Sequence, residues 1–331
     1  MIDKIFVDGI LSGRVAFVTG GGTGITGGVA RALAEAGANV ALVSRSLEHL
    51  EPAAKAINDA RVERGSNPLG SSPTVREERG SSPAVREERG SSPTVREERG
   101  SSPTVREERG SSPTVREKRG SSPTVREGLG GGEAFAIASD VRNPEQVDKA
   151  IADTIARFGK IDIVVNGAAG NFLSPAEALS PNGFGTVVDI DLKGTFNVCR
   201  AAFAQLKEHQ GQILNISATL HYLGTPMQLH VSAAKAGVDA LTRNLAVEWG
   251  RYGIRVNGIA PGPIADTEGM KRLVPEALKE KLKKNIPLGR FGRISDIEKA
   301  AVFLCSDAAS FINGAILVVD GGQWLSAARM V

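Results

Sequence analysis

The stretch Val15-Ala16-Phe17-Val18-Thr19-Gly20-Gly21-Gly22-Thr23-Gly24-Ile25-Thr26-Gly27 decides the fold of this chain. Its first four residues are apolar and predict a buried strand, its glycines predict a tight turn, and residues 28–36 continue with the apolar spacing of a helix. A strand, a glycine-rich turn and a helix direct free backbone N–H groups and the positive end of a helix dipole at a pyrophosphate. We therefore expect a dinucleotide loop, although a glycine-rich turn alone also fits a simple tight turn.

A ten-residue repeat interrupts the chain. From Ser71 to Gly130 the unit Ser-Ser-Pro-Thr-Val-Arg-Glu-Glu-Arg-Gly occurs six times with small changes. Each unit has one valine as its only large apolar residue, so it buries too little surface to offset the entropy of ordering. We expect residues 65–130 to be a disordered insert. A specific binding role for the repeats is the alternative.

The residues outside the insert have the size and pattern of one domain. Residues 1–64 and 131–331 together number 265, and predicted strands alternate with helices along them. This alternation is typical of a mostly parallel sheet covered on both faces. The expected fold class is α/β, a single doubly wound Rossmann domain with a seven-stranded sheet and ligands at the carboxyl ends of the strands. The predicted strands are residues 15–18, 39–45, 134–138, 161–166, 212–217, 254–259 and 315–319. A single long helix is expected over residues 181–209.

Composition excludes several classes of protein. The net charge is +3, and residues 65–130 hold twelve Lys and Arg against ten Asp and Glu, so the remainder is nearly neutral and nucleic-acid binding is not expected. There is no apolar run of about 18 residues, which argues against a membrane span. The first eight residues lack the basic-then-apolar plan of a signal peptide. Cys199, Cys305 and the four histidines are unclustered, so neither a disulfide framework nor a metal site is expected.

Five landmarks, each after a predicted strand or at a helix start, resemble the pattern of the short-chain dehydrogenase/reductase family. The resemblance covers nearly all of the chain outside the insert. One departure is Thr26, where the family usually has a third glycine, and its side chain should push helix and strand slightly apart unless Gly27 absorbs the shift. The landmarks are the glycine loop, Asp140-Val141, Asn166-Gly167-Ala168-Ala169-Gly170, Lys235 and Pro261-Gly262-Pro263-Ile264.

The resemblance implies a nicotinamide cofactor with Asp140 at the adenine, the Asn166 backbone beside the cofactor, and residues 261–267 around the nicotinamide amide. Arg45, at the end of the second predicted strand, favours a ribose 2′-phosphate and hence NADP(H), since an acid there would favour a free hydroxyl. The alternative for Arg45 is a solvated charge beside a helix. The expected cofactor-binding residues are Gly20, Gly21, Gly22, Thr23, Gly24, Ile25, Arg45, Asp140, Asn166, Lys235, Pro261, Gly262, Ile264 and Thr267.

The proton-donor positions of the family hold apolar residues in this chain. The slot of the usual Tyr, four residues before Lys235, is Val231, and the slot of the usual Ser is Ala218. Asp191 replaces the usual Asn. Because valine and alanine cannot transfer protons, routine alcohol–ketone chemistry is disfavoured.

A branch of the family, the 2,4-dienoyl-CoA reductases and the peroxisomal type in particular, resembles the sequence more closely. In that branch a hydride reaches the far carbon of a conjugated thioester, and the resemblance implies that Asp191 and Lys235 are catalytic and act through a water that delivers the proton. For Asp191 the alternative is a stabilising ion pair. His230 is expected to pack or to line the substrate, with a role as the acid as the alternative. The matching motifs are Ala168–Leu173, Asp189–Asp191, Ala218–Leu220, His230 and Thr267–Gly269.

The resemblance also assigns a site for the CoA thioester. It places Phe172 against the acyl chain, Ser180, Pro181 and Asn182 near the thioester, and Arg142 and Arg272 at the CoA phosphates. The alternative is that both arginines are ordinary surface charges without a binding role. Residues 266–287, rich in Lys and Glu, are expected to form a substrate lid. His221 and Tyr222 match no branch motif and are expected in a mobile loop, with Tyr222 as the backup proton donor.

The predicted function is therefore NADPH-dependent reduction of 2,4-dienoyl-CoA thioesters to enoyl-CoA in unsaturated fatty-acid β-oxidation. The alternatives are a reductase of another enoyl- or 3-ketoacyl-thioester and a catalytically silent dinucleotide-binding protein. A homotetramer is expected from the habit of the family. Because residues 328–331, Ala-Arg-Met-Val, lack a Ser-Lys-Leu-like address, the cytoplasm is the expected location.

Overall fold

The computed structural model describes residues 6–66, 131–265 and 267–326. Seven parallel strands form one sheet in the order β3-β2-β1-β4-β5-β6-β7. The expected doubly wound α/β fold is thus confirmed, and its switch point lies between the carboxyl ends of β1 and β4. The repeats, with the disorder expected of them, lie outside the described residues. The strands are β1 (Val15–Thr19), β2 (Asn39–Ser44), β3 (Ala134–Ala138), β4 (Ile163–Asn166), β5 (Gln212–Ile216), β6 (Arg255–Pro261) and β7 (Ile316–Val319).

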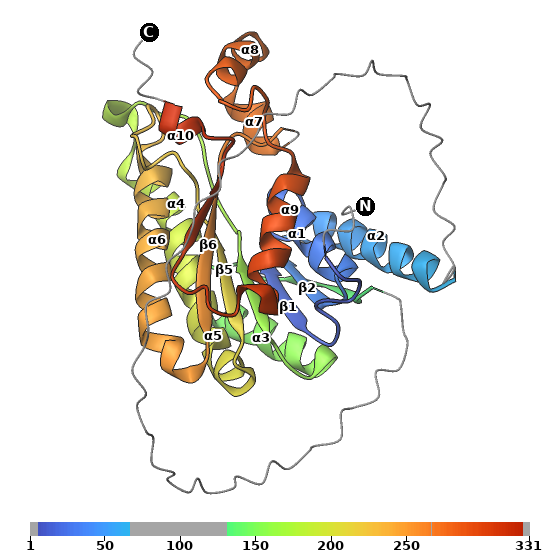
Figure 1. Ribbon diagram of the computed structural model, residues 1–331. Helices are drawn as coiled ribbons and strands as arrows, with labels where there is room; N and C mark the ends of the chain where they lie inside the picture. Colours follow the sequence, from blue (N-terminus) through green and yellow to red (C-terminus); the bar gives the residue numbers. More distant parts are fainter. Residues whose placement is uncertain (1–5, 67–130, 266, 327–331) are drawn as a thin grey trace, which may run out of the picture. The chain divides into compact units, whose positions relative to one another are not determined.

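Helices cover both faces of this sheet (Figure 1). Helices α1, α2 and α9 pack on one face, and α3, α5 and α6 pack on the other. The helices are α1 (Gly24–Glu35), α2 (Leu47–Ser66), α3 (Pro144–Phe158), α4 (Pro181–Val188), α5 (Gly194–His209), α6 (Leu229–Trp249), α7 (Glu268–Leu273), α8 (Glu276–Lys284), α9 (Ile294–Leu304) and α10 (Gln323–Ser326). Short 3₁₀ turns occur at Ala176–Ala178, Gly250–Tyr252 and Asp307–Ala309. No helix in the described part of the chain has the length and hydropathy needed to cross a membrane.

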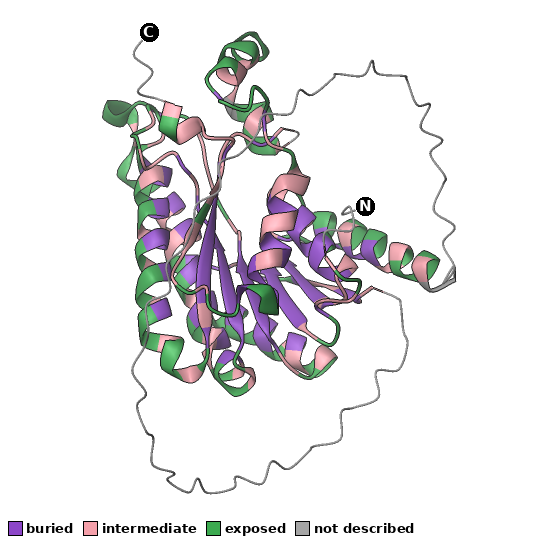
Figure 2. Ribbon diagram, viewed as in Figure 1, coloured by how far each residue is buried: buried purple, intermediate pink, exposed green. Residues whose placement is uncertain are grey.

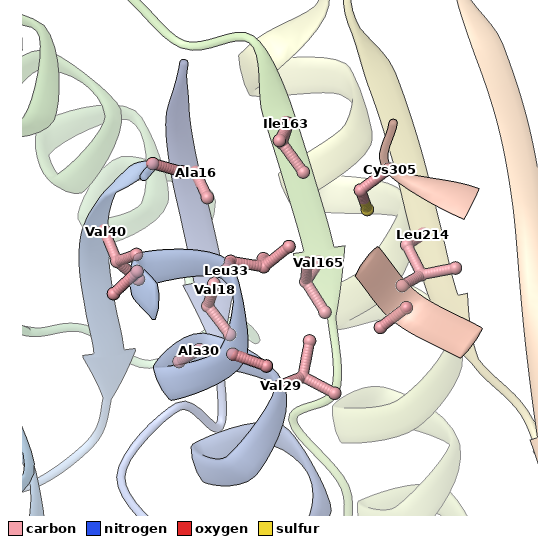
Figure 3. Packing of buried hydrophobic residues seen from close by; sticks show 14 of the residues in the cluster. Ala16, Val18, Val29, Ala30, Leu33, Val40, Ile163, Val165, Leu214 and Cys305 are labelled. Carbon is pink, nitrogen blue, oxygen red and sulfur yellow. The ribbon is translucent and has the colours of Figure 1, made fainter. Parts of the chain in front are cut away.

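The two-residue period of the strands divides the core into two layers. Along β1, Ala16 and Val18 belong to the cluster that α1 covers, whereas Phe17 belongs to the cluster on the opposite face. In Figure 3, Val29 and Leu33 of α1 lie against residues of β1 and β4. Each fully buried side chain of this kind contributes about 2 kcal/mol. Figure 2 shows the result, with the central strands β1, β4 and β5 buried along their whole length and the helices exposed on their outer faces.

The prediction of one continuous α-helix over residues 181–209 is wrong for the middle of that range. A π-helical turn, Asp189–Lys193, separates α4 from α5. A π-turn places an extra residue in the helical repeat and often marks a functional site. The π-turn could not be predicted, because the apolar spacing on either side continues as in an ordinary helix.

Candidate active site

The glycine loop forms an open cradle at the start of α1. The backbone N–H of Gly20 donates to the carbonyl of Val43 at 2.7 Å, which ties the loop to β2. Gly24 opens α1 with φ +58°, and a Cβ there would have no heavy atom within 4 Å. Thr23, at the N-cap, makes no side-chain capping bond. The first N–H groups of a helix have no partner within the helix, and here the Thr23 side chain does not cap them and the space beside Gly24 is open, which fits a pyrophosphate.

The rest of the loop packs closely. Gly21 lies against the end of β1 and Gly22 against the backbone of His49 in α2. Ile25, on the first turn of α1, packs against the core cluster below. The predicted loop residues are thus brought together at the carboxyl end of β1.

Thr26 is accommodated by a glycine on another loop. Its Oγ1 donates to the carbonyl of Gly20 at 2.7 Å. Its methyl group lies over Gly167, where a Cβ would come within 1.9 Å of Thr26 Cγ2. Gly27 also allows a close approach, since a Cβ there would lie 3.2 Å from Gly22 C, but the space for the Thr26 methyl group itself comes from Gly167, after β4.

Arg45, Asp140 and Arg142 gather at the ends of β2 and β3. Arg142 binds the Asp140 carboxylate through Nη2 at 2.5 Å and Nε at 3.0 Å. These hydrogen bonds, opposed by burial and aided by the charges of Arg142 and Arg45, hold the pKa of Asp140 below its ordinary value. The site therefore contains a carboxylate bound by the Arg142 guanidinium, with the Arg45 charge near enough to lower its pKa further.

The segment after β6 runs from the sheet to the start of α7. Gly262 N–H donates to the carbonyl of Val319 at 3.0 Å. Ile264 is buried and pairs with Gly292 in a parallel bridge. Thr267 caps α7: its Oγ1 accepts from Met270 N–H at 3.2 Å and donates to the Ile264 carbonyl at 3.0 Å. Pro261, the last residue of β6, and Thr267 thus delimit a segment fixed at both ends.

Asp191 and Lys235 meet at the carboxyl ends of β4 and β5. Asp191 lies on the π-turn with 0% of its surface exposed, and its Oδ1 accepts from Gly170 N–H at 2.7 Å. Its Oδ2 lies 3.2 Å from Lys235 Nζ, which also donates to the carbonyl of Ile216 at 2.9 Å. The predicted catalytic pair is therefore a buried ion pair held by two separate backbone segments, one after β4 and one at the end of β5.

One carboxylate oxygen of Asp191 can still accept a hydrogen bond. Asp191 Oδ2 forms the ion pair but has no hydrogen bond of good geometry with any residue in the described ranges. The Thr195 hydroxyl instead donates to the main-chain carbonyl of Asp191 at 2.6 Å. A buried, unsatisfied carboxylate oxygen is a position that a water or a ligand group can occupy.

The slot of the family's proton-donating phenol lies in an apolar cluster. Val231 is buried with Val187 and Ala234, and Phe172 and Leu220 pack against them. The side chains at this slot can contact an acyl chain but cannot move a proton.

His230 lies beside this cluster as an unusual buried imidazole. Its ring centroid is 4.3 Å from that of Phe172, with the ring planes at 42°. Neither ring nitrogen has a hydrogen bond of good geometry among the described residues, although the Phe172 backbone lies close enough to raise the pKa slightly. Burial lowers the pKa of His230, more than the negative charge of Asp191 raises it. The ring is therefore neutral and packs on the residue that the resemblance assigns to the acyl chain.

The residues expected around the thioester lie at the start of α4. Ser180 caps this helix, its Oγ accepting from Gly183 N–H at 3.0 Å, and Pro181 and Asn182 form its exposed first turn. Phe172 packs near the same turn.

Arg272, on α7, donates to the carbonyl of Asn171 at 3.4 Å, next to Phe172. Arg142, the other arginine expected at CoA phosphates, is held instead by Asp140 at the end of β3. The two arginines thus contact different segments.

Asn166 points away from the loop. Its side-chain amide donates to Asn215 Oδ1 at 2.9 Å and contacts Cys199 Sγ at 3.3 Å. Burial raises the pKa of the Cys199 thiol to about 12, so this contact is with a neutral thiol. The side-chain amide of Asn166 therefore joins β4 to β5, while its Oδ1 is buried without a hydrogen-bond partner among the described residues.

A second buried carboxylate, Asp239, was missed in the sequence. It accepts from Ser217 Oγ at 2.5 Å and from Tyr222 OH at 3.2 Å, and its Oδ2 lies 2.9 Å from His221 Nε2. The interpretation of His221 and Tyr222 as mobile-loop residues is therefore wrong. The available signal was an acid four residues after Lys235, which places it on the same face of the helix as that lysine.

Tyr222 is unsuited to proton donation. Burial, with the neighbouring Asp239 carboxylate, raises the pKa of its phenol to about 12. Its hydroxyl proton already bonds to Asp239. A phenol that is this weakly acidic, and whose proton is already donated to a carboxylate, is a poor general acid at neutral pH.

Two family models match the chain. The model described as short chain dehydrogenase matches residues 14–69, and the model described as Enoyl-(Acyl carrier protein) reductase matches residues 115–323. The pair covers both sides of the repeat segment.

Individual proteins agree with the family models. A peroxisomal 2,4-dienoyl-CoA reductase [(3E)-enoyl-CoA-producing] of Arabidopsis thaliana is 53% identical over 207 residues, 60% of this chain and 70% of that protein. A protein of the same name from Danio rerio is 37% identical over 329 residues, 99% of this chain and 87% of its own length. Among solved structures, a putative short-chain alcohol dehydrogenase from Sinorhizobium meliloti 1021 superposes with a TM-score of 0.69 at 30% identity, covering 95% of this chain and 97% of that one.

Proposed function

Because the chain belongs to the short-chain dehydrogenase/reductase family, we propose that it reduces 2,4-dienoyl-CoA thioesters with NADPH during the oxidation of unsaturated fatty acids. One observation carries the proposal: the buried Asp191–Lys235 ion pair faces a site whose usual proton-donor slot is Val231. That arrangement suits a reaction that needs a water-borne proton and no phenol. The names of the relatives support the substrate class.

The chemistry that NADPH would supply is a hydride for the far carbon of the conjugated thioester. Asp191 Oδ2 and Lys235 Nζ would together polarise a water bound beside the pair, and that water would give its proton to the α-carbon of the resulting dienolate. The hydroxide left behind is neutralised by a proton from solvent. One double bond then remains between the third and fourth carbons, which is the (3E)-enoyl product that the names of the relatives specify.

The residues that would hold the cofactor follow the carboxyl edge of the sheet. The N–H groups at the start of α1 bind the pyrophosphate. Arg45 binds the ribose 2′-phosphate, Asp140 the adenine, and Lys235 the nicotinamide ribose. The segment Pro261–Thr267 surrounds the nicotinamide amide. Support for NADPH over NADH comes from Arg45, which is exposed and close enough to Asp140 to affect its pKa.

The substrate would lie between the apolar cluster and the first turn of α4. Phe172 and His230 form the wall for the acyl chain, and the helix end capped by Ser180 lies near the thioester. Arg272 and Arg142 contact the CoA phosphates, Arg272 from the lid formed by α7 and α8. Because His230 is neutral, it adds no charge to this wall.

The test is to follow NADPH consumption with 2,4-hexadienoyl-CoA, 2-hexenoyl-CoA and acetoacetyl-CoA side by side. The proposal expects the highest kcat/KM for the dienoyl thioester. A preference for 2-hexenoyl-CoA or acetoacetyl-CoA would replace it with a reductase of another thioester. Tight NADPH binding with no turnover of any of the three would identify a catalytically silent dinucleotide-binding protein.

Assembly and location are part of the proposal. We infer a homotetramer from the habit of the family, and light scattering on a size-exclusion column tests it. A cytoplasmic location is proposed from the sequence, whereas the relatives are named as peroxisomal proteins. Imaging of the full chain in its own host, with the fluorescent tag away from the C-terminus, separates the two.

A further inference from the structure

Asp239 is a buried acid that the reaction above does not use. Only 2% of its surface is exposed, and it lies one helical turn after Lys235 on α6. An isolated buried charge is strongly destabilising unless several donors surround it. Asp239 has three, and all three come from one short stretch, residues 217–222.

These bonds fix both ends of the same turn. Ser217 directly follows Ile216, the residue whose carbonyl accepts from Lys235. His221 and Tyr222 lie beyond the turn and return to the other carboxylate oxygen. Residues 218–220 therefore lie between two points at which the chain is hydrogen-bonded to the Asp239 side chain: Ser217 on one side, and His221 with Tyr222 on the other. One face of α6 holds the end of β5 through Lys235 and the following loop through Asp239.

Residues 218–220 lie beside the apolar cluster that is proposed to contact the acyl chain. Leu220 packs against the apolar cluster that also contacts Phe172. Thr219 N–H donates to the carbonyl of Pro261 at 3.4 Å, which links the turn to the segment after β6. A shift of this turn would therefore move one side of the acyl site.

Tyr222 also connects this loop to the segment that follows β7. The Tyr222 ring lies 5.5 Å from the Trp324 ring in an edge-on arrangement. Asp320 accepts from Trp324 N–H at 2.8 Å and from Gly322 N–H at 2.8 Å, which holds that segment in place. Tyr222 thus joins Asp239 on one side and a bonded C-terminal turn on the other.

We propose that Asp239 is a positioning residue, which holds residues 217–222 so that Leu220 and its neighbours form a fixed wall for the acyl chain of the thioester. This inference rests on the proposed function for its substrate. Asp239 touches neither the reacting atoms nor the cofactor in this account, and it acts through Ser217, His221 and Tyr222. Its removal should weaken substrate binding more than it slows the chemical step.

The decisive variant is Asp239→Asn, because an amide keeps the size of the side chain and cannot accept all three bonds. At a temperature well below its Tm, KM for 2,4-hexadienoyl-CoA should rise about tenfold or more, as expected when a wall of the site is misplaced. The Kd for NADPH and kcat should change by less than about threefold, because Lys235 and Asp191 keep their contacts. The matched control is Asp153→Asn, an acid on α3 that pairs with Lys149 and should leave every constant unchanged.

Two further variants keep the test decisive if Asp239→Asn does not fold. His221→Leu and Tyr222→Phe each remove one donor and leave the carboxylate with two. KM should rise in both, and more for His221→Leu, whose bond of 2.9 Å is shorter than the 3.2 Å bond from Tyr222. An unchanged KM in both folded variants would overturn the positioning role.

Amide hydrogen exchange separates this inference from the proposed function. In Asp239→Asn, peptides covering residues 218–228 should exchange faster, while peptides from α1 and β4 keep the rate of the unaltered chain. If the unaltered chain does not reduce the dienoyl thioester, the proposed function fails, and the exchange result alone then decides whether Asp239 positions the loop. If exchange and KM are both unchanged in folded Asp239→Asn, or exchange accelerates without a change in KM, the inference is wrong.

Discussion

Lys235 Nζ lies 3.2 Å from Asp191 Oδ2, although the two residues come from different helices. Asp191 is presented by the π-turn between α4 and α5, and Lys235 by the early turns of α6. The carbonyl of Ile216 and the N–H of Gly170 fix the two partners from opposite sides. The pair therefore occupies a rigid position with one carboxylate oxygen still available.

Cofactor choice should depend on Arg45. In Arg45→Asp a phosphate partner is replaced by an acceptor for a ribose hydroxyl, so preference should shift from NADPH toward NADH. The measurement is the ratio of kcat/KM for the two cofactors. If that ratio does not move, Arg45 does not contact the 2′ position.

Gly167 and Thr26 should behave as a coupled pair. Gly167→Ala places a Cβ 1.9 Å from Thr26 Cγ2 and should cost about 1–3 kcal/mol of the free energy of unfolding. Adding Thr26→Ser removes the clashing methyl group and keeps the hydroxyl that binds the Gly20 carbonyl, so most of the loss should return. Urea unfolding of the single and double variants checks this. Additive losses would show that the two side chains do not compete for one space.

Acid stability should depend on Asp239. Burial alone would raise the pKa of this carboxyl, but hydrogen bonds from His221 and Ser217, with the charge of His221 and the hydroxyl of Tyr222, lower it below the ordinary 3.8. A lowered pKa in the folded state contributes stability above the unfolded value and loses it as the pH falls through the folded value.

The free energy of unfolding, measured from neutral to acid pH, should therefore fall less steeply for Asp239→Asn than for the unaltered chain once the pH drops below about 4. The control, Asp153→Asn, should follow the unaltered chain. Parallel curves for Asp239→Asn and the unaltered chain would contradict the lowered pKa.

Deletion of the repeats should leave the domain nearly intact. The chain is already bonded to the domain at Gly132, whose N–H donates to the carbonyl of Ala34 at 2.8 Å, and β2 and β3 on either side of the repeats are paired neighbours. Replacing residues 67–130 with a short Gly-Ser linker, which spares the end of α2, should change the free energy of unfolding by no more than about 1 kcal/mol. Unfolding and activity assays check this, and a loss of several kcal/mol or of activity would contradict the reading of the repeats as an insert.

The sequence predicted the fold well because its signals are local. The glycine loop after β1 and the apolar strands need only neighbouring residues to be recognised, and the sheet confirms them. Asp191 and Lys235 were identified by their positions in a family pattern, and the structure brings them together.

What the sequence did not predict depends on contacts between distant segments. The π-turn at Asp189–Lys193 leaves no trace in the apolar spacing. The space that Gly167 gives to Thr26 connects residues 141 positions apart. The bonds of Asp239 to His221 and Tyr222 join a helix to a loop, and polar residues in a loop ordinarily indicate solvent exposure.

Substitution of Lys235 tests whether this residue binds the cofactor in addition to its role in proton delivery. Lys235→Ala should weaken NADPH binding and turnover together, because this side chain is also expected at the nicotinamide ribose. Fluorescence titration of NADPH and steady-state rates give the two values. Loss of turnover with an unchanged Kd for NADPH would confine Lys235 to proton delivery.

The most direct test of the account is the turnover of Asp191→Asn with NADPH and 2,4-hexadienoyl-CoA, measured beside Tyr222→Phe. If Asp191 and Lys235 organise the water that delivers the proton, kcat of Asp191→Asn should fall about 10²–10⁴-fold with NADPH binding retained, the usual effect of removing a positioned acid–base group. Tyr222→Phe should keep kcat within about twofold, because its phenol bonds to Asp239 and has no part in the proton transfer. An inactive Tyr222→Phe with an active Asp191→Asn would contradict the account, since the proton would then come from a phenol moved along the chain.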